Sequence, residues 1–535
     1  MHDVTLPCLL NARARSNPAD VFLEEVTGRK LTFAEVEHAA LLWAEVFRQQ
    51  GVNPGDTVLT MLPSTTEAVC AWLGLGWMRA IDVGVNVEFH GVFLRDLIAD
   101  SGAGVMVAHH RYVPQILEAQ NGADRRLHTL IVVDGPDDQI AAAAGDIKLL
   151  SAGDLLAKAT AQQLPFPHHY DIACLIYTSG TTGRAKGVLI PWAQIHATCM
   201  GSMDMYERGD AYYSPFPMNH TSGRLPVLFM AYVGGRLVMR ERFSAAEFWD
   251  DVRRFQCTTT SMPGTIAGML YARPPQPDDR NNPLRFVSMI PLIPQLDAFR
   301  RRFGVEVRTM FNQTELSSPL VSNGTNLVDN RSCGRARSGY QIRLVDEHDE
   351  EVPTGETGEM IVRSDRPWEL MAGYHGRPDA TAEAWRNGWF HTGDLFTCDR
   401  DGNFYYVDRR KDSIRRRGEN ISSVELEAQV NAHPAVLESA AVGVPAELGE
   451  EEIKLVILPR PGSVIDPAEL IAFLMSRIPR FMVPRYVEIV QELPRTPAMQ
   501  RVQKVRLREM GVTPQTWDRT AATQPEAHPP RTTGS

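Results

Sequence analysis

The sequence has no apolar run long enough to cross a membrane. A membrane-spanning helix needs about 18 consecutive apolar residues, whereas segment 225–232, among the longest apolar runs, is short enough for a buried strand or helix. The N-terminal segment 1–16 carries an early Asp3 and no apolar core of the length found in signal peptides. We therefore expect no membrane span and a cytoplasmic location.

Cysteine and lysine are also scarce. The seven cysteines are odd in number and lack the spacing of metal ligands, as is typical of free thiols in a reducing compartment. Only seven of the 55 basic residues are lysine. The formal net charge of -10 argues against nucleic acid as the main partner, because a polyanion is bound by a basic surface.

The sequence does contain the patterns of a large α/β protein. Its 535 residues exceed the size at which one hydrophobic core stops growing. Strand-like and helix-like segments alternate along the first third, which favours a largely parallel sheet. Thr32 and Glu35 form a capping box at the start of the first long helix. The predicted helices are 32–50, 67–79 and 93–101, and the predicted strands are 57–62, 81–87, 104–108, 127–133 and 172–176.

The later part of the chain contains a second layer, a hairpin and a hinge. Segment 192–303 is consistent with a second sheet layer in the same large body, and 364–386 with a loop. D-R-D-G-N at 399–403 predicts a hairpin turn, and the charged segment 409–418 is a candidate hinge. The elements expected around and after the hinge are strands 404–407, 436–444, 453–458 and 486–490 and helices 423–432 and 467–476.

These patterns predict an α/β fold with a large N-terminal domain of stacked sheets and helices and a small α+β C-terminal domain. We expect the first domain at 1–411 and the second at 412–512. Residues 513–535 are rich in Thr, Pro, Gln and Ala and hold one large aromatic residue, Trp517. Such a stretch buries too little surface to order itself, so we expect a disordered tail.

One stretch is rich in glycine, serine and threonine and is a candidate phosphate-binding loop. Segment 177–187 reads Y-T-S-G-T-T-G-R-A-K-G and follows the apolar strand 172–176. A loop this rich in Gly, Ser and Thr can turn successive backbone N–H groups and hydroxyls onto an anion. It matches neither the Walker A nor the Rossmann fingerprint. A flexible surface turn is the alternative, but the preceding strand and the following Lys186 favour a phosphate site.

Four further motifs follow this loop in order. They are P-M-N-H at 217–220, F-N-Q-T-E at 311–315, G-W-F-H-T-G-D at 388–394 and D-R-R-K-D at 408–412. Together the five motifs resemble the ordered motif set of the adenylate-forming superfamily, which contains acyl-CoA synthetases, peptide-synthetase adenylation domains and luciferases. The resemblance runs from roughly residue 10 to 510. It is strongest to acyl-CoA ligases, nearest the carnitine/crotonobetaine CoA-ligase branch.

The resemblance implies a two-step reaction. A carboxylate attacks the α-phosphate of ATP to give acyl-AMP and pyrophosphate, and the thiol of CoA then displaces AMP. The implied small molecules are a carboxylic acid or its adenylate, ATP or acyl-AMP, CoA and Mg2+. The resemblance further implies that the C-terminal domain swings about the hinge residue Asp412 between the two steps.

The resemblance also assigns nucleotide-binding residues. It implies that Glu315 offers a hard oxygen to Mg2+, that Thr314 bonds the α-phosphoryl group, and that Phe311 presents a ring face to adenine. Asp394 would accept the ribose hydroxyls with Arg409 beside it, although alone Asp394 could cap a turn and Arg409 could belong to a solvated face. The full implied set for ATP or AMP is Thr178, Ser179, Gly180, Thr181, Thr182, Gly183, Lys186, Phe311, Asn312, Thr314, Asp394 and Arg409.

Other implied positions concern the acyl group and CoA. His220 corresponds to the family residue that gates the acyl pocket, and a buried core histidine is the alternative. Met289 and Ile290 lie in S-M-I-P-L at 288–292, where most relatives have a glycine-rich turn, so the acyl pocket is expected to be reshaped. The implied CoA-binding residues are Arg415, Gly418 and Asn420.

The largest departure from the family lies near the C-terminus. Relatives carry a motif like T-P-x-G-K-V-Q-K, whose first lysine reaches between the carboxylate and the α-phosphate. This chain reads T-P-A-M-Q-R-V-Q-K at 496–504, with Arg501 in that place. Arg501 joins Thr314, Glu315 and His220 as a candidate catalytic residue. Because a guanidinium fork does not replace a compact ammonium group, we hypothesise that adenylation is weak or lost while thioester formation is intact. A separate adenylating enzyme is then a candidate partner.

Three other functions stay open. The chain could be an ordinary two-step ATP-dependent acyl-CoA synthetase, or a stand-alone adenylation protein that loads a carrier protein. It could also be a catalytically silent subunit that binds acyl nucleotide or CoA. The phosphate loop, Glu315 and Asp394 argue against the silent subunit.

Overall fold

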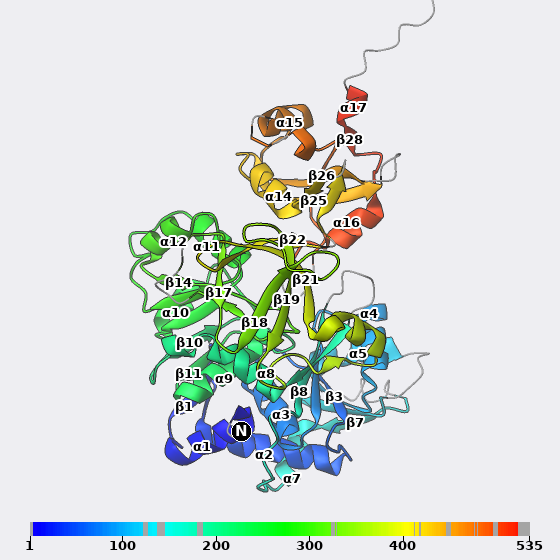
Figure 1. Cartoon of the computed structure of the whole chain (residues 1–535). Helices are drawn as coiled ribbons and strands as arrows, with labels where there is room; N and C mark the ends of the chain where they lie inside the picture. The colour runs from blue at the N-terminus through cyan, green and yellow to red at the C-terminus, as the bar shows by residue number, and fades with distance from the viewer. Residues whose placement is uncertain are drawn as a thin grey trace, which may run out of the picture.

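We describe the protein from a computed structural model. Figure 1 shows a large N-terminal body and a smaller C-terminal domain, coloured gold to red, that sits on it above β22 (Asn403–Arg409). The side chains of residues 415, 419, 420 and 481 are outside the described part. The described residues are 4–120, 127–135, 145–178, 186–322, 327, 329–410, 412–416, 419–445, 451–475, 477–478, 480–495 and 501–522.

The first sheet carries the strand that leads into the predicted phosphate loop. It has eight strands in the order β20-β9-β8-β4-β3-β5-β6-β7. The pairs from β8 to β7 are parallel, whereas β9 pairs antiparallel with β8 and with β20. The largely parallel sheet is thus confirmed. Its strands are β3 (Thr57–Met61), β4 (Ile81–Gly84), β5 (Val105–His109), β6 (Thr129–Val133), β7 (Lys148–Ser151), β8 (Ile172–Thr178), β9 (Lys186–Pro191) and β20 (Gly373–Tyr374).

Helices pack against this sheet. The predicted capping box starts α2 (Phe33–Gln49): Glu35 N donates to Thr32 Oγ1 at 3.3 Å, and Thr32 N donates to the Glu35 carboxylate at 2.8 Å. Within the described ranges, no helix is long and apolar enough to cross a membrane. The other helices of this part are α3 (Thr66–Trp77), α4 (Gly91–Ser101), α5 (Val113–Gln120), α7 (Ala152–Lys158) and α8 (Trp192–Met200).

The second sheet has seven strands in the order β14-β13-β12-β10-β11-β1-β2. Segment 192–303 supplies only part of it, because β1 from the N-terminal region pairs parallel with β11. Its strands are β1 (Val21–Glu25), β2 (Lys30–Thr32), β10 (Ala211–Ser214), β11 (Arg236–Met239), β12 (Thr259–Met262), β13 (Phe286–Met289) and β14 (Glu306–Arg308). Its helices are α1 (Leu6–Ser16), α9 (Thr221–Val233), α10 (Phe248–Arg254), α11 (Gly264–Ala272) and α12 (Leu296–Phe303).

The third sheet is antiparallel throughout, in the order β15-β16-β17-β22-β21-β19-β18. The predicted turn at 399–403 joins β21 to β22, as expected. The expectation of a plain loop at 364–386 is wrong in part, since that stretch contains β20 and α13 (Pro378–Ala384). The remaining strands are β15 (Met310–Phe311), β16 (Leu320–Val321), β17 (Ser332–Ala336), β18 (Tyr340–Val345), β19 (Gly358–Ser364) and β21 (Phe390–Cys398).

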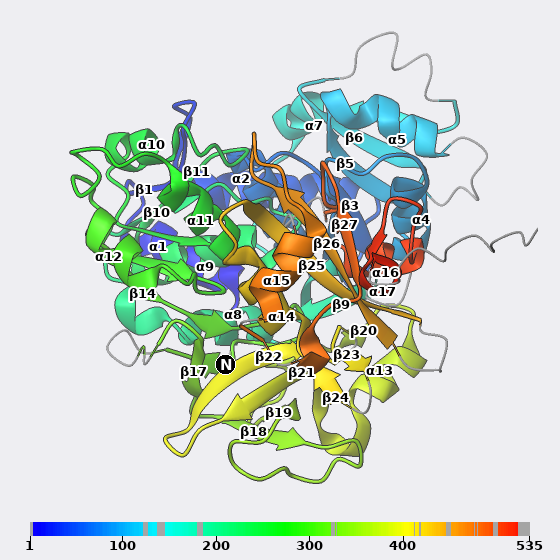
Figure 2. The ribbon, with the colours of Figure 1, turned by 90° about the horizontal axis from the view of Figure 1, so that it is seen from above.

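One hydrophobic core joins the three sheets. It contains Ile176 from the first sheet, Phe22 from the second and Phe396 from the third, each at most 1% exposed. Burial of this kind stabilises a fold in proportion to the apolar area removed from water. Seen from above in Figure 2, the parts of the large body surround the C-terminal domain, which lies over their centre.

The C-terminal domain has its own core and its own sheet. Buried Ile414, Leu426 and Leu455 belong to one cluster confined to this domain. It is joined to β22 through Asp408 Oδ2, which accepts hydrogen bonds from Ser423 N at 2.6 Å and Ser423 Oγ at 2.7 Å. Its elements are β23 (Ile414–Arg416), β24 (Glu419–Ile421), α14 (Ser423–Asn431), β25 (Val436–Pro445), β26 (Glu451–Pro459), α15 (Pro467–Met475), β27 (Tyr486–Ile489), α16 (Lys504–Met510), β28 (Trp517–Asp518) and α17 (Arg519–Ala522).

The expected tail begins later than residue 513. Strand β28 pairs antiparallel with β27, and Arg485 Nη2 lies 3.0 Å from Asp518 Oδ2. Trp517 packs against the core of the C-terminal domain. The prediction is therefore wrong for residues 513–522, because a short segment can order itself by completing the edge of an existing sheet. Residues 523–535 lie outside the described part.

Candidate active site

The two ends of the predicted phosphate loop lie side by side in the first sheet. Thr178 ends β8 and Lys186 begins β9, and the two residues pair across the antiparallel ladder. The loop between them therefore opens at the carboxyl end of β8, the edge where α/β sheets bind ligands. The predicted loop residues Ser179, Gly180, Thr181, Thr182 and Gly183 lie outside the described part of the chain.

Tyr374 of β20 connects Lys186 with Glu315. Its hydroxyl donates a hydrogen bond of 2.9 Å to Glu315 Oε1. The Lys186 ammonium group lies 4.9 Å from the centre of the Tyr374 ring, within the range of a cation–π interaction. Burial, followed by the charge of Glu315, raises the pKa of Tyr374, so that its hydroxyl remains a donor. Sequence reasoning missed Tyr374, whose only local signal is a G-Y pair inside a loop-like stretch.

A side chain of α8 forms hydrogen bonds with the backbone on both sides of Glu315. Gln194 Nε2 donates to the carbonyl oxygens of Thr314 at 2.8 Å and Leu316 at 2.9 Å. Met371 N donates to the carbonyl oxygen of Glu315 at 3.0 Å. Main chain fixed on both sides thus directs the half-buried Glu315 carboxylate. Sequence reasoning missed Gln194 as well, although an amide on the buried face of an apolar helix is a signal that it has a partner.

Asp394 and Arg409 face each other across the β21–β22 ladder. Asp394 Oδ1 lies 3.3 Å from Arg409 Nε, and Gln313 Nε2 donates to Asp394 Oδ2 at 2.5 Å. Oδ1 is buried and accepts no hydrogen bond from the described residues. Burial raises the pKa of Asp394 to about 6, against the opposing effects of Arg409, Gln313 and Arg501. Oδ1 thus has the charge of Arg409 nearby but no aligned hydrogen bond, which a ligand hydroxyl could donate.

Phe311 and Asn312 lie next to this pair. The Phe311 ring meets the Phe396 ring edge-on, with centroids 4.9 Å apart and an interplanar angle of 84°. Asn312 Oδ1 accepts a hydrogen bond of 3.1 Å from Ser318 N. The Asn312 side chain therefore supports the turn of its own segment, and Phe396 fixes the direction of the half-buried Phe311 ring.

His220 is the N-terminal cap of α9. Its Nδ1 accepts a hydrogen bond of 3.1 Å from Ser222 N. Burial, followed by the charges of Arg501 and Arg224, lowers the pKa of His220 to about 4. The imidazole is therefore neutral near pH 7, and the cap holds its ring in place.

Arg501 approaches this region from the C-terminal domain. Its charge contributes to the lowered pKa of His220 and opposes the raised pKa of Asp394. Its side chain keeps contact with solvent, yet desolvation, followed by repulsion from Arg409, lowers the pKa of Arg501 itself. The charge of the arginine at the position of the family lysine thus affects two of the predicted site residues, His220 and Asp394.

Lys504, the second basic residue of the same motif, is engaged elsewhere. Its Nζ lies 2.8 Å from Glu427 Oε1 and donates a hydrogen bond of 2.5 Å to Ser423 Oγ. Ser423 in turn donates to Asp408 at the junction of the two domains. Lys504 therefore supports the domain junction, and moving it toward Arg501 would break these contacts.

The predicted acyl-pocket residues differ in exposure. Met289 ends β13 and is fully buried in the core of the second sheet. Ile290 is half-buried. Of these two residues, only Ile290 therefore reaches an accessible surface.

The predicted hinge and CoA residues begin the C-terminal domain. Asp412 N donates to the carbonyl oxygen of Arg409 at 2.8 Å, and its carboxylate lies 2.5 Å from Arg508 of α16. Arg415 and Asn420 pair across the β23–β24 hairpin. Their side chains, and all of Gly418, lie outside the described part.

A cavity adjoins the site. It has a volume of about 790 Å3 and is lined by residues that include Tyr374, Trp368 and Arg377. None of the predicted site residues that the structure describes lines it. Tyr374 therefore contacts both this cavity and the residues Glu315 and Lys186.

Comparison with known proteins identifies the family. The family model described as AMP-binding enzyme matches residues 10–375, and the model for the AMP-binding enzyme C-terminal domain matches residues 425–499. The chain belongs to the AMP-binding enzyme family. The crotonobetaine/carnitine–CoA ligase of Salmonella paratyphi A is 31% identical over 476 residues, which cover 87% of this chain and 91% of that protein. The predicted membership among acyl-CoA ligases of the adenylate-forming superfamily is thereby confirmed.

Solved members of the AMP-binding enzyme family share the fold. The anthranilate CoA ligase AuaEII, in complex with anthranoyl-AMP, is 24% identical with a TM-score of 0.83, covering 94% of this chain and 96% of that one. ATP-bound MatB from Rhodopseudomonas palustris is 24% identical with a TM-score of 0.82, covering 95% and 98%. These similarities confirm the predicted fold class of a large α/β domain followed by a small one.

The residues present fit the nucleotide and the cation that the AMP-binding enzyme family implies. Buried Asp394 Oδ1 accepts no hydrogen bond from the described residues, as a ribose-binding acceptor requires. Glu315 offers carboxylate oxygen, the ligand type that Mg2+ prefers. Lys186 places a positive charge at the end of the predicted phosphate loop, over the ring of Tyr374, whose hydroxyl donates to Glu315.

Proposed function

We propose that this chain forms a CoA thioester from a carboxylic acid by way of acyl-AMP, with a weak adenylation step and an intact thioester-forming step. The observation that carries the proposal is the position of the two basic residues of the C-terminal motif. The charge of Arg501 contributes to the pKa values of His220 and Asp394, while contacts with Glu427 and Ser423 hold Lys504. Adenylation therefore depends on a guanidinium group at the place of the family lysine.

Each half of the nucleotide has its own residues in this proposal. Asp394 accepts the ribose hydroxyls, since its buried Oδ1 accepts no hydrogen bond from the described residues. Lys186, with Thr178 and the loop that follows, binds the β- and γ-phosphates. Thr314 hydrogen-bonds the α-phosphoryl group. Mg2+, bound through Glu315, would neutralise charge on the phosphates.

Adenylation is expected to be weak because of how Arg501 bonds. A lysine ammonium group is a compact charge with three donors that can bridge a carboxylate and a phosphate from one point, whereas a guanidinium group is a planar fork with fixed donor directions. Losing one well-placed donor to a developing charge costs about 3 kcal/mol, roughly 100-fold in rate. Arg409 also repels Arg501. This repulsion opposes the binding of Arg501 to Asp394, with which Arg409 is already paired.

Thioester formation uses other residues. The hairpin of β23 and β24, which carries Arg415 and Asn420, is the candidate contact for CoA, and Asp412 is the candidate hinge. These residues lie in a different part of the C-terminal domain sequence from Arg501. A weak first step is therefore compatible with an intact second step, and a separate adenylating enzyme could supply the acyl-AMP.

The ordinary two-step acyl-CoA synthetase is the second candidate. The observation that favours it is the same approach of Arg501 to His220 and Asp394, which keeps a cation at the reacting centre. The two candidates differ in one measurable ratio, the rate of thioester formation from acyl-AMP divided by the rate from acid and ATP. The first predicts much faster thioester formation from acyl-AMP than from acid and ATP, and the second predicts similar rates.

The experiment compares acyl-AMP plus CoA with carboxylic acid plus ATP plus CoA. The panel of acids includes crotonobetaine, carnitine, anthranilate and benzoate, because relatives and structural neighbours are named as ligases of these acids. Arg501→Lys should raise the ATP-dependent rate and leave the acyl-AMP-dependent rate unchanged. Arg495→Lys is the matched control, since Arg495 of the same domain pairs with Glu438 and lies outside the predicted site.

The outcomes separate the alternatives. Equal turnover by both routes would establish the ordinary synthetase and sink the weak-adenylation proposal. Turnover only when a carrier protein replaces CoA would identify a carrier-loading protein. Binding of acyl-AMP without turnover to either acceptor would identify a silent binding subunit.

A further inference from the structure

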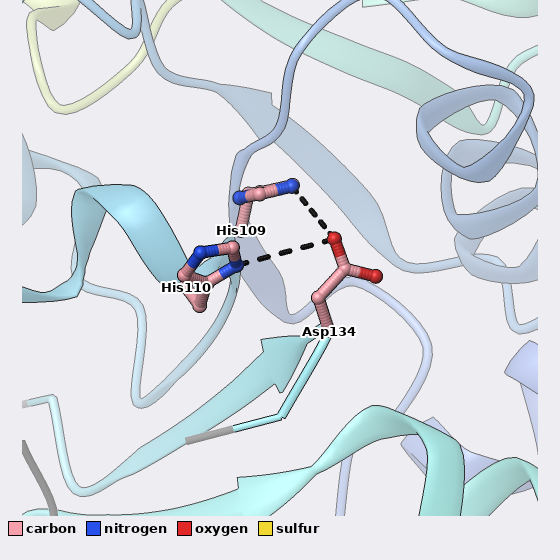
Figure 3. A group of neighbouring side chains, drawn as sticks. All are labelled: His109, His110 and Asp134. Atoms are coloured by element: carbon pink, nitrogen blue, oxygen red, sulfur yellow. Dashed lines mark ion pairs between the residues drawn. The ribbon is translucent and has the colours of Figure 1, made fainter. Parts of the chain in front are cut away.

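A second group of chemistry-bearing side chains lies at the carboxyl edge of the first sheet, among residues that the proposed reaction does not use. His109 ends β5, His110 follows it in a short 3-10 helix (His110–Tyr112), and Asp134 follows β6. Strands β5 and β6 are parallel neighbours with His109 opposite Val133, so both ends meet at one edge. Figure 3 shows the two imidazoles and the carboxylate pointing toward one another.

The distances suit a shared ion. His109 Nε2 lies 2.8 Å and His110 Nδ1 lies 3.9 Å from Asp134 Oδ2. One donor atom from each of the three side chains lies within 4.8 Å of the other two. A tetrahedral zinc ion with ligands at about 2.1 Å places its ligand atoms about 3.4 Å apart. The two measured distances lie on either side of that value, so small side-chain rotations would complete the geometry.

We propose that His109 Nε2, His110 Nδ1 and the Asp134 carboxylate bind a divalent transition-metal ion of the Zn2+ class. Two imidazoles and one carboxylate are a ligand set that suits Zn2+ and similar ions rather than Mg2+, which prefers oxygen. The His110 and Asp134 side chains are 48% and 61% exposed, so the ion would keep at least one position for water. This site is distinct from the Mg2+ position at Glu315.

Arg111, next to His110 in the chain, carries a positive charge that opposes a bound cation. Arg111 itself pairs with Glu241 at 3.1 Å. The only competing contact of His109 Nδ1 that the described residues show is a long one, 3.4 Å from Arg111 N. Its loss, when Nδ1 carries the proton and Nε2 binds the metal, costs little.

A second pair of consecutive histidines shows why the carboxylate of Asp134 matters for the proposed metal site. His168 and His169 are also consecutive, and Asp171 lies nearby in sequence. Arg79, however, holds the Asp171 carboxylate through two hydrogen bonds, of 2.8 and 3.0 Å. Asp171 is thus committed to a guanidinium group, whereas Asp134 faces two imidazoles. His168 and His169 therefore make a matched control.

The test is a titration of the metal-free, full-length protein with Co2+ alone, followed by visible absorption and by competition with Zn2+. We expect one Co2+ per chain with a nitrogen- and oxygen-ligand spectrum. His110→Ala and Asp134→Asn should each weaken binding roughly 100-fold or more, since loss of an outer-shell partner alone costs 10- to 100-fold. His169→Ala should bind Co2+ as the unmodified protein does.

Three results would overturn the proposal. They are the absence of saturable Co2+ binding by the unmodified protein, an Asp134→Asn variant that binds with unchanged affinity, and a thiolate-to-cobalt charge-transfer band, which would assign the ion to one of the seven cysteines. Far-UV circular dichroism and thioester formation from acyl-AMP should be unchanged in His110→Ala and Asp134→Asn. Those two readouts separate loss of the metal site from loss of the fold.

Discussion

Replacing Tyr374 with Phe should weaken adenylation far more than thioester formation. The Tyr374 hydroxyl donates a 2.9 Å hydrogen bond to the Glu315 carboxylate, and hydrogen bonds to charged groups contribute about 1.5–3 kcal/mol. Phe keeps the aromatic ring beside Lys186, which lies 4.9 Å from its centre, so the substitution removes the hydroxyl alone. If the whole contribution is expressed in the adenylation transition state, the rate falls roughly 10- to 150-fold.

The assay measures the two half-reactions separately. AMP formation from acid and radiolabelled ATP reports adenylation even when it is slow, and thioester formation from acyl-AMP and CoA reports the second step. Tyr405→Phe is the matched control, because the Tyr405 hydroxyl donates a hydrogen bond of the same 2.9 Å length to Asp399 Oδ2 at the β21–β22 turn. It should leave both half-reactions unchanged.

A thermodynamic cycle tests the link between Tyr374 and Glu315 directly. If Tyr374 acts through Glu315, the losses from Tyr374→Phe and Glu315→Gln should not add in the double variant. Additive losses, an equal loss in both half-reactions, or an equal loss in Tyr405→Phe would refute the reasoning. Each of these outcomes would show that the hydroxyl does not position the Glu315 carboxylate for adenylation.

Two further predictions concern the ribose acceptor and the end of the chain. Adenosine binding, measured by calorimetry, should weaken as the pH falls through about 6, because burial raises the pKa of Asp394 to about 6 and a protonated carboxyl is a poorer acceptor. Asp394→Asn should bind more weakly and lose this pH dependence, and a pH dependence that persists would contradict the assignment. Deleting 513–535 should lower the melting temperature, since β28 and the Arg485–Asp518 pair are lost. Deleting 523–535 should leave it unchanged, and equal melting temperatures for the two truncations would contradict a structural role for β28.

The elements that the sequence predicts well are those with local signals. The first long helix is recognised because Thr32 and Glu35 cap it and its apolar residues recur at helical spacing. The β21–β22 hairpin is recognised because D-R-D-G-N specifies a turn. The parallel part of the first sheet follows from the alternation of strands and helices. The helix and the hairpin are specified by neighbouring residues, and the parallel sheet by the order of successive elements along the chain.

The features that the sequence does not predict depend on distant partners. Strand β1 joins the second sheet by pairing with β11, more than 200 residues later. Gln194 and Thr314 are 120 positions apart, as is typical of contacts that only the assembled fold creates. Tyr374 has no periodic neighbours to mark it, since β20 has two residues. No local pattern records such pairings, so these positioning residues are recognised only in the structure.

The prediction of a disordered tail is wrong for residues 513–522 for a different physical reason. Composition describes whether a segment can bury enough surface on its own. Residues 513–522 do not need to, because β27 offers an open edge and Arg485 offers a partner to Asp518. Amino-acid composition therefore indicates whether a segment can fold alone. It does not indicate whether the segment can add a strand to an existing sheet.

Arginine at position 501 carries the same charge as the family lysine, but its hydrogen-bond donors point in different directions. Attraction for ATP depends on charge and distance, and Arg501 still acts on both His220 and Asp394. Bridging two anions at the moment of reaction depends on where the donors point. The proposed deficit in adenylation should therefore lower kcat, with the KM for ATP little changed. A gain by Arg501→Lys confined to the KM for ATP would instead mean that the arginine fails to bind the nucleotide, and the argument from donor geometry would then be wrong.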